Sequence, residues 1–338
     1  MGRRTRQKQQ QKREQAAQKQ RSPETGEHDR EESQHQQESA DLGHVSVLLK
    51  PAIQFLNIRR GGTYADVTLG LAGHSSAIAQ HLGPDGTLIA FDRDEHALRI
   101  AADRLERTLR ELGTEAPQLR LVHASFSRIG EYVSPATLDG LLADFGVSSI
   151  QLDDAARGFS FRADGPLDMR MNAQEDRSAD QVVNHLDEQT LADVIYELGE
   201  ERRSRRIARA IVRARPIRTT AHLAEVVSAA APAMYQPGKR QIHPATRTFQ
   251  ALRMFVNREL EEVEALLTHA PALLGTGGRL VAISFHSLED RRVKDHMRDL
   301  SQSGTYDLLT KKPVTADEQE LNRNPRSRSA KLRAAQRR

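Results

Sequence analysis

The chain contains no cysteine among its 338 residues. Without thiols it can form no disulfide, no cysteine-ligated zinc site and no iron–sulfur cluster. A thiol nucleophile is excluded in the same way, which limits the chemistry that can be assigned to the chain. A chain without disulfides suits a reducing compartment, and we expect a cytoplasmic location.

Aromatic residues are scarce, at 4% of the chain, and tryptophan is absent. Sheets that bind RNA by stacking bases need exposed aromatic rings in their strands, so this class of binding module is disfavoured. Long apolar runs are missing as well, because no segment approaches the roughly eighteen apolar residues of a membrane span. The N-terminus is charged and lacks the apolar segment of a secretory signal. We therefore expect no membrane partner.

Charge is unevenly distributed along the chain. The formal net charge of +4 and the sequence pI of about 9.4 suit a polyanionic partner but are weak evidence for one. Residues 1–42 are rich in Gln, Arg, Lys, Glu and Ser and show no periodic apolar face, which predicts a disordered tail. The tail begins basic and ends acidic, so it is either a solvated segment or an arm that tethers RNA.

From about His44 onward, short apolar segments alternate with amphipathic ones. This alternation predicts an α/β fold, with a mostly parallel sheet covered by helices on both faces. The predicted strands are 63–69, 87–91, 119–123, 138–143 and 279–285, and the predicted helices between them are 75–82, 94–112 and 246–267. Asp94 is a plausible N-cap for the second of these helices.

The strand pattern stops between about residues 154 and 243. Three helices are predicted there, at 188–197, 200–215 and 220–231. A helical insertion within an α/β domain is the simplest explanation. We therefore divide the chain into four parts: a tail (1–42), a discontinuous cofactor-binding domain (43–154 and 246–305), an all-helical insertion (155–245) and a basic C-terminal extension without a core pattern (306–338).

Small residues follow the first predicted strand, in the run from Gly70 to Ser75. Such a turn lets a ligand approach the backbone, and the next helix offers free N–H groups. Asp92 ends the second strand, where an acid in a doubly wound sheet accepts hydrogen bonds from ribose hydroxyls. The pattern predicts a nucleoside-containing cofactor, although an ordinary turn with a surface Asp would look similar. The dinucleotide fingerprint G-x-G-x-x-G is absent, which disfavours NAD and leaves S-adenosylmethionine.

Asp144 directly follows the fourth predicted strand and should project from the same edge of the sheet. A carboxylate there can bind the cofactor or accept a hydrogen bond from a substrate amine. The alternative is a turn or helix-capping Asp.

Other segments combine residues typical of binding sites. The loop 157–171 mixes glycines, aromatics and charges without periodicity, which suggests a functional loop. Arginines spaced by three and four residues, Arg202, Arg206, Arg209 and Arg213, form either a phosphate-binding stripe or a solvated helix face. The spacing of His74, His243 and His286 does not suggest metal ligands, and we expect no metal.

Six segments in order, 66–75, 144–152, 157–171, 202–213, 243–253 and 284–291, resemble one family closely. It is the bacterial 16S ribosomal RNA cytosine-N4-methyltransferase family, also called MraW or RsmH. The resemblance runs from His44 to the segment 324–329 and leaves out only the tail. It implies a class I S-adenosylmethionine-dependent methyltransferase fold, Rossmann-like, with an inserted all-helical domain. Its implied substrate is one cytidine in the decoding centre of the small ribosomal subunit.

The resemblance also implies which residues bind the cofactor. By matching motif positions, S-adenosylmethionine would contact Ala72, Gly73, His74, Asp92, Phe126, Asp144 and Gln151. The chain departs from the family at three positions, where Gly, Pro and Asp are usual and this chain has Ala72, Ile150 and Asn172.

The missing cysteine also bears on the reaction. Methylation of cytosine at C5 usually proceeds through a cysteine adduct, so the chain should methylate nitrogen or oxygen. We place Asp144 nearest the N4 amine, orienting the amine or the cofactor. The arginine stripe and Arg247 are expected to hold the RNA.

Two other functions remain open from the sequence alone: an NAD-dependent oxidoreductase, and a non-catalytic ribosome assembly factor with a vestigial cofactor pocket. The sequence leaves undetermined the target nucleotide, the group that takes the proton, the role of the tail and the oligomeric state, a homodimer included.

Overall fold

The computed structural model describes residues 46–232 and 243–338. The tail predicted over residues 1–42 lies outside these residues. In the described part, no helix is both long enough and apolar enough to span a bilayer.

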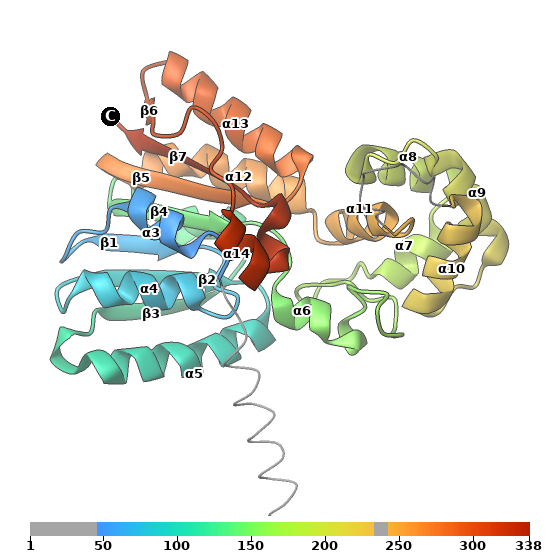
Figure 1. The fold of residues 1–338 in the computed structure, drawn as a ribbon, viewed down its shortest axis with the longest axis horizontal. Coiled ribbons are helices and arrows are strands. Elements are labelled where there is room, and N and C mark those ends of the chain that lie inside the picture. The colour runs from blue at the N-terminus through green and yellow to red at the C-terminus, as the bar shows by residue number, and fades with distance from the viewer. Residues whose placement is uncertain (1–45, 233–242) are drawn as a thin grey trace, which may run out of the picture. The chain divides into compact units, whose positions relative to one another are not determined.

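Within the described ranges, seven strands form one sheet, in the order β3-β2-β1-β4-β5-β7-β6 (Figure 1). Neighbours from β3 to β5 pair in parallel, whereas β7 pairs antiparallel with both β5 and β6. The strands are β1 (Thr63–Asp66), β2 (Thr87–Asp92), β3 (Gln118–His123), β4 (Leu138–Asp144), β5 (Leu274–Ser284), β6 (Tyr306–Leu308) and β7 (Lys331–Arg337). The predicted mostly parallel sheet is confirmed.

Alternating side chains divide the apolar residues of the sheet between two cores. In β4, Leu141 belongs to one core and Leu142 to the other, because successive side chains of a strand point to opposite faces. Helices α3 (Leu49–Leu56) and α4 (Gly73–Leu82) cover one face, and α12 (Glu259–Leu273) and α13 (Ser287–Gln302) cover the other. The sheet is therefore buried on both faces, as its near-continuous apolar strands require.

Helix α5 (Glu95–Leu112) begins where the sequence predicts. The Asp94 side chain accepts hydrogen bonds from the backbone N–H groups of His96 and Ala97, so Asp94 is its N-cap. Short helical segments connect the elements that follow. They are η1 (Gly113–Glu115), η2 (Phe126–Glu131), α6 (Ser149–Asp153) and η3 (Ala155–Arg157).

The helical insertion has a core of its own. Figure 1 shows its helices grouped together. Its helices are α7 (Ala179–His185), α8 (Glu188–Gly199), α9 (Ser204–Ala214), α10 (Thr220–Ala230) and α11 (Thr246–Val256). Helix α11, which the sequence assigned to the cofactor-binding domain, contributes Phe249, Leu252 and Val256 to this core.

The single helix predicted over 246–267 is wrong. The chain forms α11 and α12 with a break at Asn257 and Arg258, and Arg258 adopts the left-handed conformation with φ 49°. The apolar periodicity continues across the break, so a local pattern cannot reveal it. Asn257 is held instead by distant backbone, because its side chain donates to the Met169 carbonyl and accepts from the Met171 N–H, both at 2.7 Å.

The C-terminal residues do not form an extension without a core. Residues 306–338 contribute β6, α14 (Glu318–Arg323), η4 (Pro325–Ser329) and β7. Strand β7 lies inside the sheet, with Leu332, Ala334 and Ala335 fully buried. Its sequence looks basic, but Arg333 pairs with the buried Asp290 at 2.7 Å, which satisfies the charge. The small apolar residues of β7, Ala334 and Ala335, are buried in the sheet.

Candidate cofactor and substrate site

Three parallel strands each end in an aspartate: Asp66 ends β1, Asp92 ends β2 and Asp144 ends β4. These strands are neighbours in the sheet, so their carboxyl ends meet at one edge. The sequence placed Asp92 and Asp144 at this edge, and the structure confirms that placement.

The turn after β1 brings backbone close to this edge. A Cβ at Gly73 would collide with the Ser46 hydroxyl, so a larger residue there would require the Ser46 side chain to move. Ala72 is fully buried and adopts φ 59°, ψ 20°, a left-handed conformation that costs a non-glycine residue about 1 kcal/mol. This explains the glycine usual at this position in the family that the sequence resembles, and shows that alanine keeps the same turn.

Asp92 is held by two backbone donors. The N–H of Gly70 donates to Oδ2 at 2.9 Å, and the N–H of Asp94 donates to Oδ1 at 2.8 Å. Burial raises the pKa of Asp92 to about 6, against the opposing effect of these two hydrogen bonds. Each oxygen keeps a second lone pair, so the carboxylate can still accept two hydroxyl groups.

Asp66 is a site residue that sequence reasoning did not single out. It is fully buried, and its carboxylate accepts hydrogen bonds from the Ser75 hydroxyl at 2.7 Å and the Thr68 N–H at 3.1 Å. These contacts tie the end of β1 to the start of α4 and so shape the turn. The signal was present, because Asp66 ends its strand as Asp92 and Asp144 do.

His74 and Asp144 face each other across the turn. Nδ1 of His74 lies 3.7 Å from Oδ2 of Asp144, beyond hydrogen-bonding distance, and Nε2 lies 3.1 Å from the Val47 carbonyl. A carbonyl only accepts, so Nε2 carries the proton. Burial lowers the pKa of His74 and raises that of Asp144, whose pKa the negative charges of Asp66 and Glu289 raise further. Burial thus disfavours the charged form of both groups.

The other carboxylate oxygen of Asp144, Oδ1, is buried and has no hydrogen-bond partner among the residues that the structure describes. A buried acceptor without a donor costs free energy unless a ligand supplies the donor. Asp144 thus offers an acceptor to a bound molecule.

Phe126 and Gln151 lie beside these acids. Phe126 follows β3 and packs against Phe145, with ring centroids 5.8 Å apart. Gln151 is buried in α6, and both ends of its amide are engaged: Oε1 accepts from the Ser148 N–H at 3.1 Å and Nε2 donates to Asp94 at 2.8 Å. In this structure Gln151 supports the loop that carries Asp92.

The predicted RNA-binding arginines divide into two sets. Arg206, Arg209 and Arg213 lie exposed on α9, while Arg202 is exposed in the turn before it. Arg209 pairs with Glu188 at 3.2 Å. Arg247, on α11, instead donates to the Glu200 carbonyl at 3.3 Å, within the contact between α11 and the end of α8.

Among the described residues, one group of side chains is close enough together to hold a cation: Glu259, His286 and Glu289. Both oxygens of Glu259 are bound by Arg253, each at 2.7 Å. Arg253 therefore already neutralises part of this cluster. Of the other two histidines considered from the sequence, His243 stacks on Phe161, and His74 lies near Asp144 at the carboxyl edge of the sheet.

The order of the sheet, with its antiparallel β7, and the acid that ends β2 define a class I methyltransferase. A model of the MraW methylase family matches residues 41–338, and the chain belongs to this family.

Two relatives illustrate the match. The chain is 66% identical over 293 residues to ribosomal RNA small subunit methyltransferase H of Acidobacterium capsulatum, covering 87% of this chain and 98% of that protein. It is 63% identical over 296 residues to the protein of the same name from Koribacter versatilis, covering 88% and 94%. A crystal structure of a putative rRNA methylase from Clostridium thermocellum aligns with a TM-score of 0.44 at 11% identity, covering 87% of this chain and all of that one.

Proposed function

We propose that the chain transfers a methyl group from S-adenosylmethionine to 16S rRNA in the small ribosomal subunit, at the exocyclic N4 of a cytidine in the decoding centre. The observation that carries this proposal is the family match over residues 41–338, which includes every residue of the site. The choice of N4 rests on the family resemblance and on the missing cysteine, which disfavours C5 chemistry. A small-subunit substrate would also place the enzyme in the cytoplasm.

The residues at the sheet edge fit the cofactor. Gly73 opens α4 and carries no side chain, so the backbone of this turn can approach the methionine part. Asp92 would accept the ribose hydroxyls, and Phe126 would lie against the adenine. When bound, S-adenosylmethionine supplies a methyl group already activated by its sulfonium. A vestigial pocket would not need the unpaired acceptor on Asp144.

Binding of the cofactor should depend on pH through Asp92. Because the pKa of Asp92 in the free protein is about 6, the carboxylate is present at pH 7 and is lost as the pH falls below 6. If the ribose binds only the carboxylate, the Kd for S-adenosylmethionine should rise about tenfold between pH 7 and pH 5. Isothermal titration calorimetry across this range measures the effect. Asp92→Asn should bind weakly with a flat pH profile, and an unchanged profile in the wild type would show that the ribose lies elsewhere.

Asp144 is the group that we place nearest the reacting amine. Its unpaired Oδ1 would accept a hydrogen bond from the N4 amine or from the amino group of the cofactor. The positive sulfonium nearby would favour the charged carboxylate, countering the burial that raises its pKa in the free protein. The chain's contribution to the reaction is then mainly orientation of donor and amine, with the base unstacked from the RNA.

Incubation of purified protein with small ribosomal subunits and labelled S-adenosylmethionine tests the proposed reaction. Digestion of the RNA to nucleosides should place the label in N4-methylcytidine. Label at C5 or on a ribose would overturn the assigned atom. Absence of label in a sample that binds the cofactor would favour the assembly factor.

A further inference from the structure

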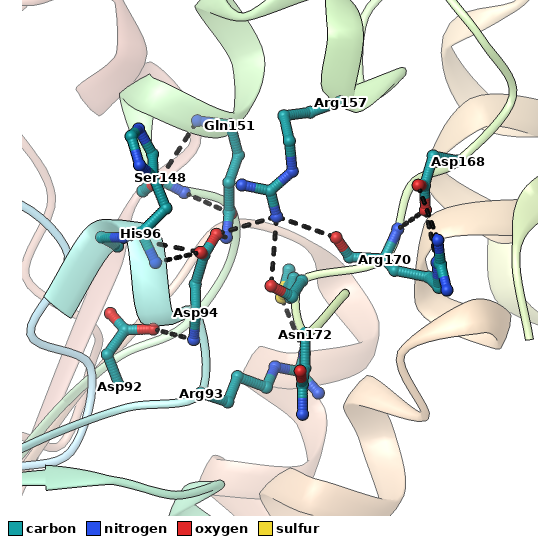
Figure 2. A network of polar contacts seen from close by, with 12 residues as sticks. Asp92, Arg93, Asp94, His96, Ser148, Gln151, Arg157, Asp168, Arg170 and Asn172 are labelled. Carbon is teal, nitrogen blue, oxygen red and sulfur yellow. Dashed lines mark hydrogen bonds and ion pairs between the residues drawn. The ribbon is translucent and has the colours of Figure 1, made fainter. Parts of the chain in front are cut away.

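The side chain of Asp94 contacts three elements, α5, α6 and η3, next to the carboxyl edge of the sheet, which we call the cofactor edge (Figure 2). Its Oδ1 caps α5. Its Oδ2 receives Nε2 of Gln151, from α6, at 2.8 Å, and lies 2.9 Å from Nη2 of Arg157. Its backbone N–H donates to Asp92 at 2.8 Å. The position of Asp94 therefore sets the position of the proposed ribose-binding carboxylate.

Arg157 reaches beyond Asp94 into the helical insertion. The same Nη2 donates to the carbonyl of Arg170 at 2.9 Å and to that of Met171 at 3.1 Å (Figure 2). The Arg157 side chain is 19% exposed and that of Asp94 is 5% exposed, so solvent screens this pair little. One guanidinium thus joins the cofactor edge to the loop around Met171.

Asn257 and Arg93 also hold the loop around Met171 in place. The N–H of Met171 donates to Asn257 at 2.7 Å, at the break between α11 and α12. Arg93, the residue between the two aspartates, donates to the Asn257 carbonyl at 2.9 Å and contacts Sδ of Met171. Met169 is held at φ 59°, a left-handed conformation that persists only where the surroundings impose it.

We propose that Arg157 is a positioning residue that holds Asp92 in register with the helical insertion, so that the cofactor and the insertion are oriented by one network. This proposal rests on the proposed ribose contact of Asp92. Arg157 itself does not touch the reacting atoms in this scheme. Without its guanidinium, Asp94 would keep the contact with Gln151 but lose its connection to the Met171 loop.

Arg157→Gln tests the proposal. We expect the Kd for S-adenosylmethionine, measured by calorimetry, and the KM for S-adenosylmethionine to rise together by about tenfold. Arg157→Lys keeps the charge but not the planar fork, and we expect about a threefold rise. Arg162 is exposed in the same loop, and its side chain forms no hydrogen bond or ion pair with the residues that the structure describes, so Arg162→Gln should bind as the wild type does. A purely structural role would lower the Tm of Arg157→Gln but leave the affinity of its folded fraction unchanged.

A double-mutant cycle identifies the partner. Asp94→Asn and Arg157→Gln both remove the contact between Asp94 and Arg157, so the double variant should lose less affinity than the product of the two single losses. Multiplicative losses, or wild-type affinity in either Arg157 variant, would overturn the proposal. Asp92→Asn distinguishes a failure of the proposed ribose contact from a failure of the proposed role of Arg157. If Asp92→Asn binds the cofactor normally, the ribose contact is wrong. If Asp92→Asn binds weakly while the Arg157 variants bind normally, the role of Arg157 is wrong. Should Arg157→Gln not fold, Arg157→Lys decides.

Discussion

Asp144→Asn should lower kcat for methylation of small subunits by at least about a hundredfold. Asparagine has the same shape but carries no charge, and half of its amide is a donor where the site needs an acceptor. The backbone N–H of Asp144 donates to Thr68 Oγ1 at 2.6 Å, so the variant should keep its place at the end of β4. Single-turnover methylation of small subunits gives the rate constant of the methyl-transfer step, which should fall by the same factor. The Kd for S-adenosylmethionine, measured alongside, shows whether Asp144 orients the cofactor or only the amine.

The matched control is Asp139→Asn, near the other end of β4. Asp139 accepts from the Thr63 N–H at 2.8 Å and pairs with Arg59. Asp139→Asn removes a carboxylate of the same kind from β4 without changing the carboxyl edge of the sheet, so its kcat should stay close to that of the wild type. Turnover of Asp144→Asn within threefold of the wild type would remove Asp144 from the reaction.

Local patterns predicted the features of this site that depend on strand ends. Asp92 and Asp144 could be placed together because parallel strands finish at one edge, and Asp94 could be recognised as an N-cap from its position before α5. The second role of Asp94 could not be predicted in this way. Gln151 and Arg157, its partners, are distant in sequence and reach it only through the packing of α6 and η3.

The two errors in the fold have a common physical origin. At Asn257 the apolar periodicity favours one continuous helix, and tertiary hydrogen bonds to Met169 and Met171 stabilise the break. In β7 the charged residues make the sequence look like an exposed segment rather than a strand. Arg333 can be buried there because it pairs with Asp290. In both places, contacts between residues far apart in sequence override the local preference.

Reversing charge on the α9 face should weaken binding to the small subunit by about a hundredfold at 0.1 M salt and lower the salt dependence of that binding. The opposite face of α9 is buried through Ile207 and Ile211, so the exposed arginines are presented outward. Arg202, Arg206 and Arg213 form no ion pair with any residue in the described ranges, which leaves these cations available for phosphates. Loss of three such contacts should reduce the slope of log Kd against log salt by about two. Filter binding of labelled subunits to the triple glutamate variant at several salt concentrations measures both quantities.

A triple variant of equal charge change on other surfaces provides the control. Arg99, Arg110 and Arg128 are exposed and paired with acids of their own helical segments, α5 and η2. If a general loss of positive charge weakened binding, this variant would be affected as strongly. If the α9 face contacts RNA directly, the control should bind subunits nearly as the wild type does, and both variants should keep the wild-type Kd for S-adenosylmethionine. Equal losses of affinity for the small subunit in the two variants would show that the α9 arginines form a solvated helix face and do not contact the RNA.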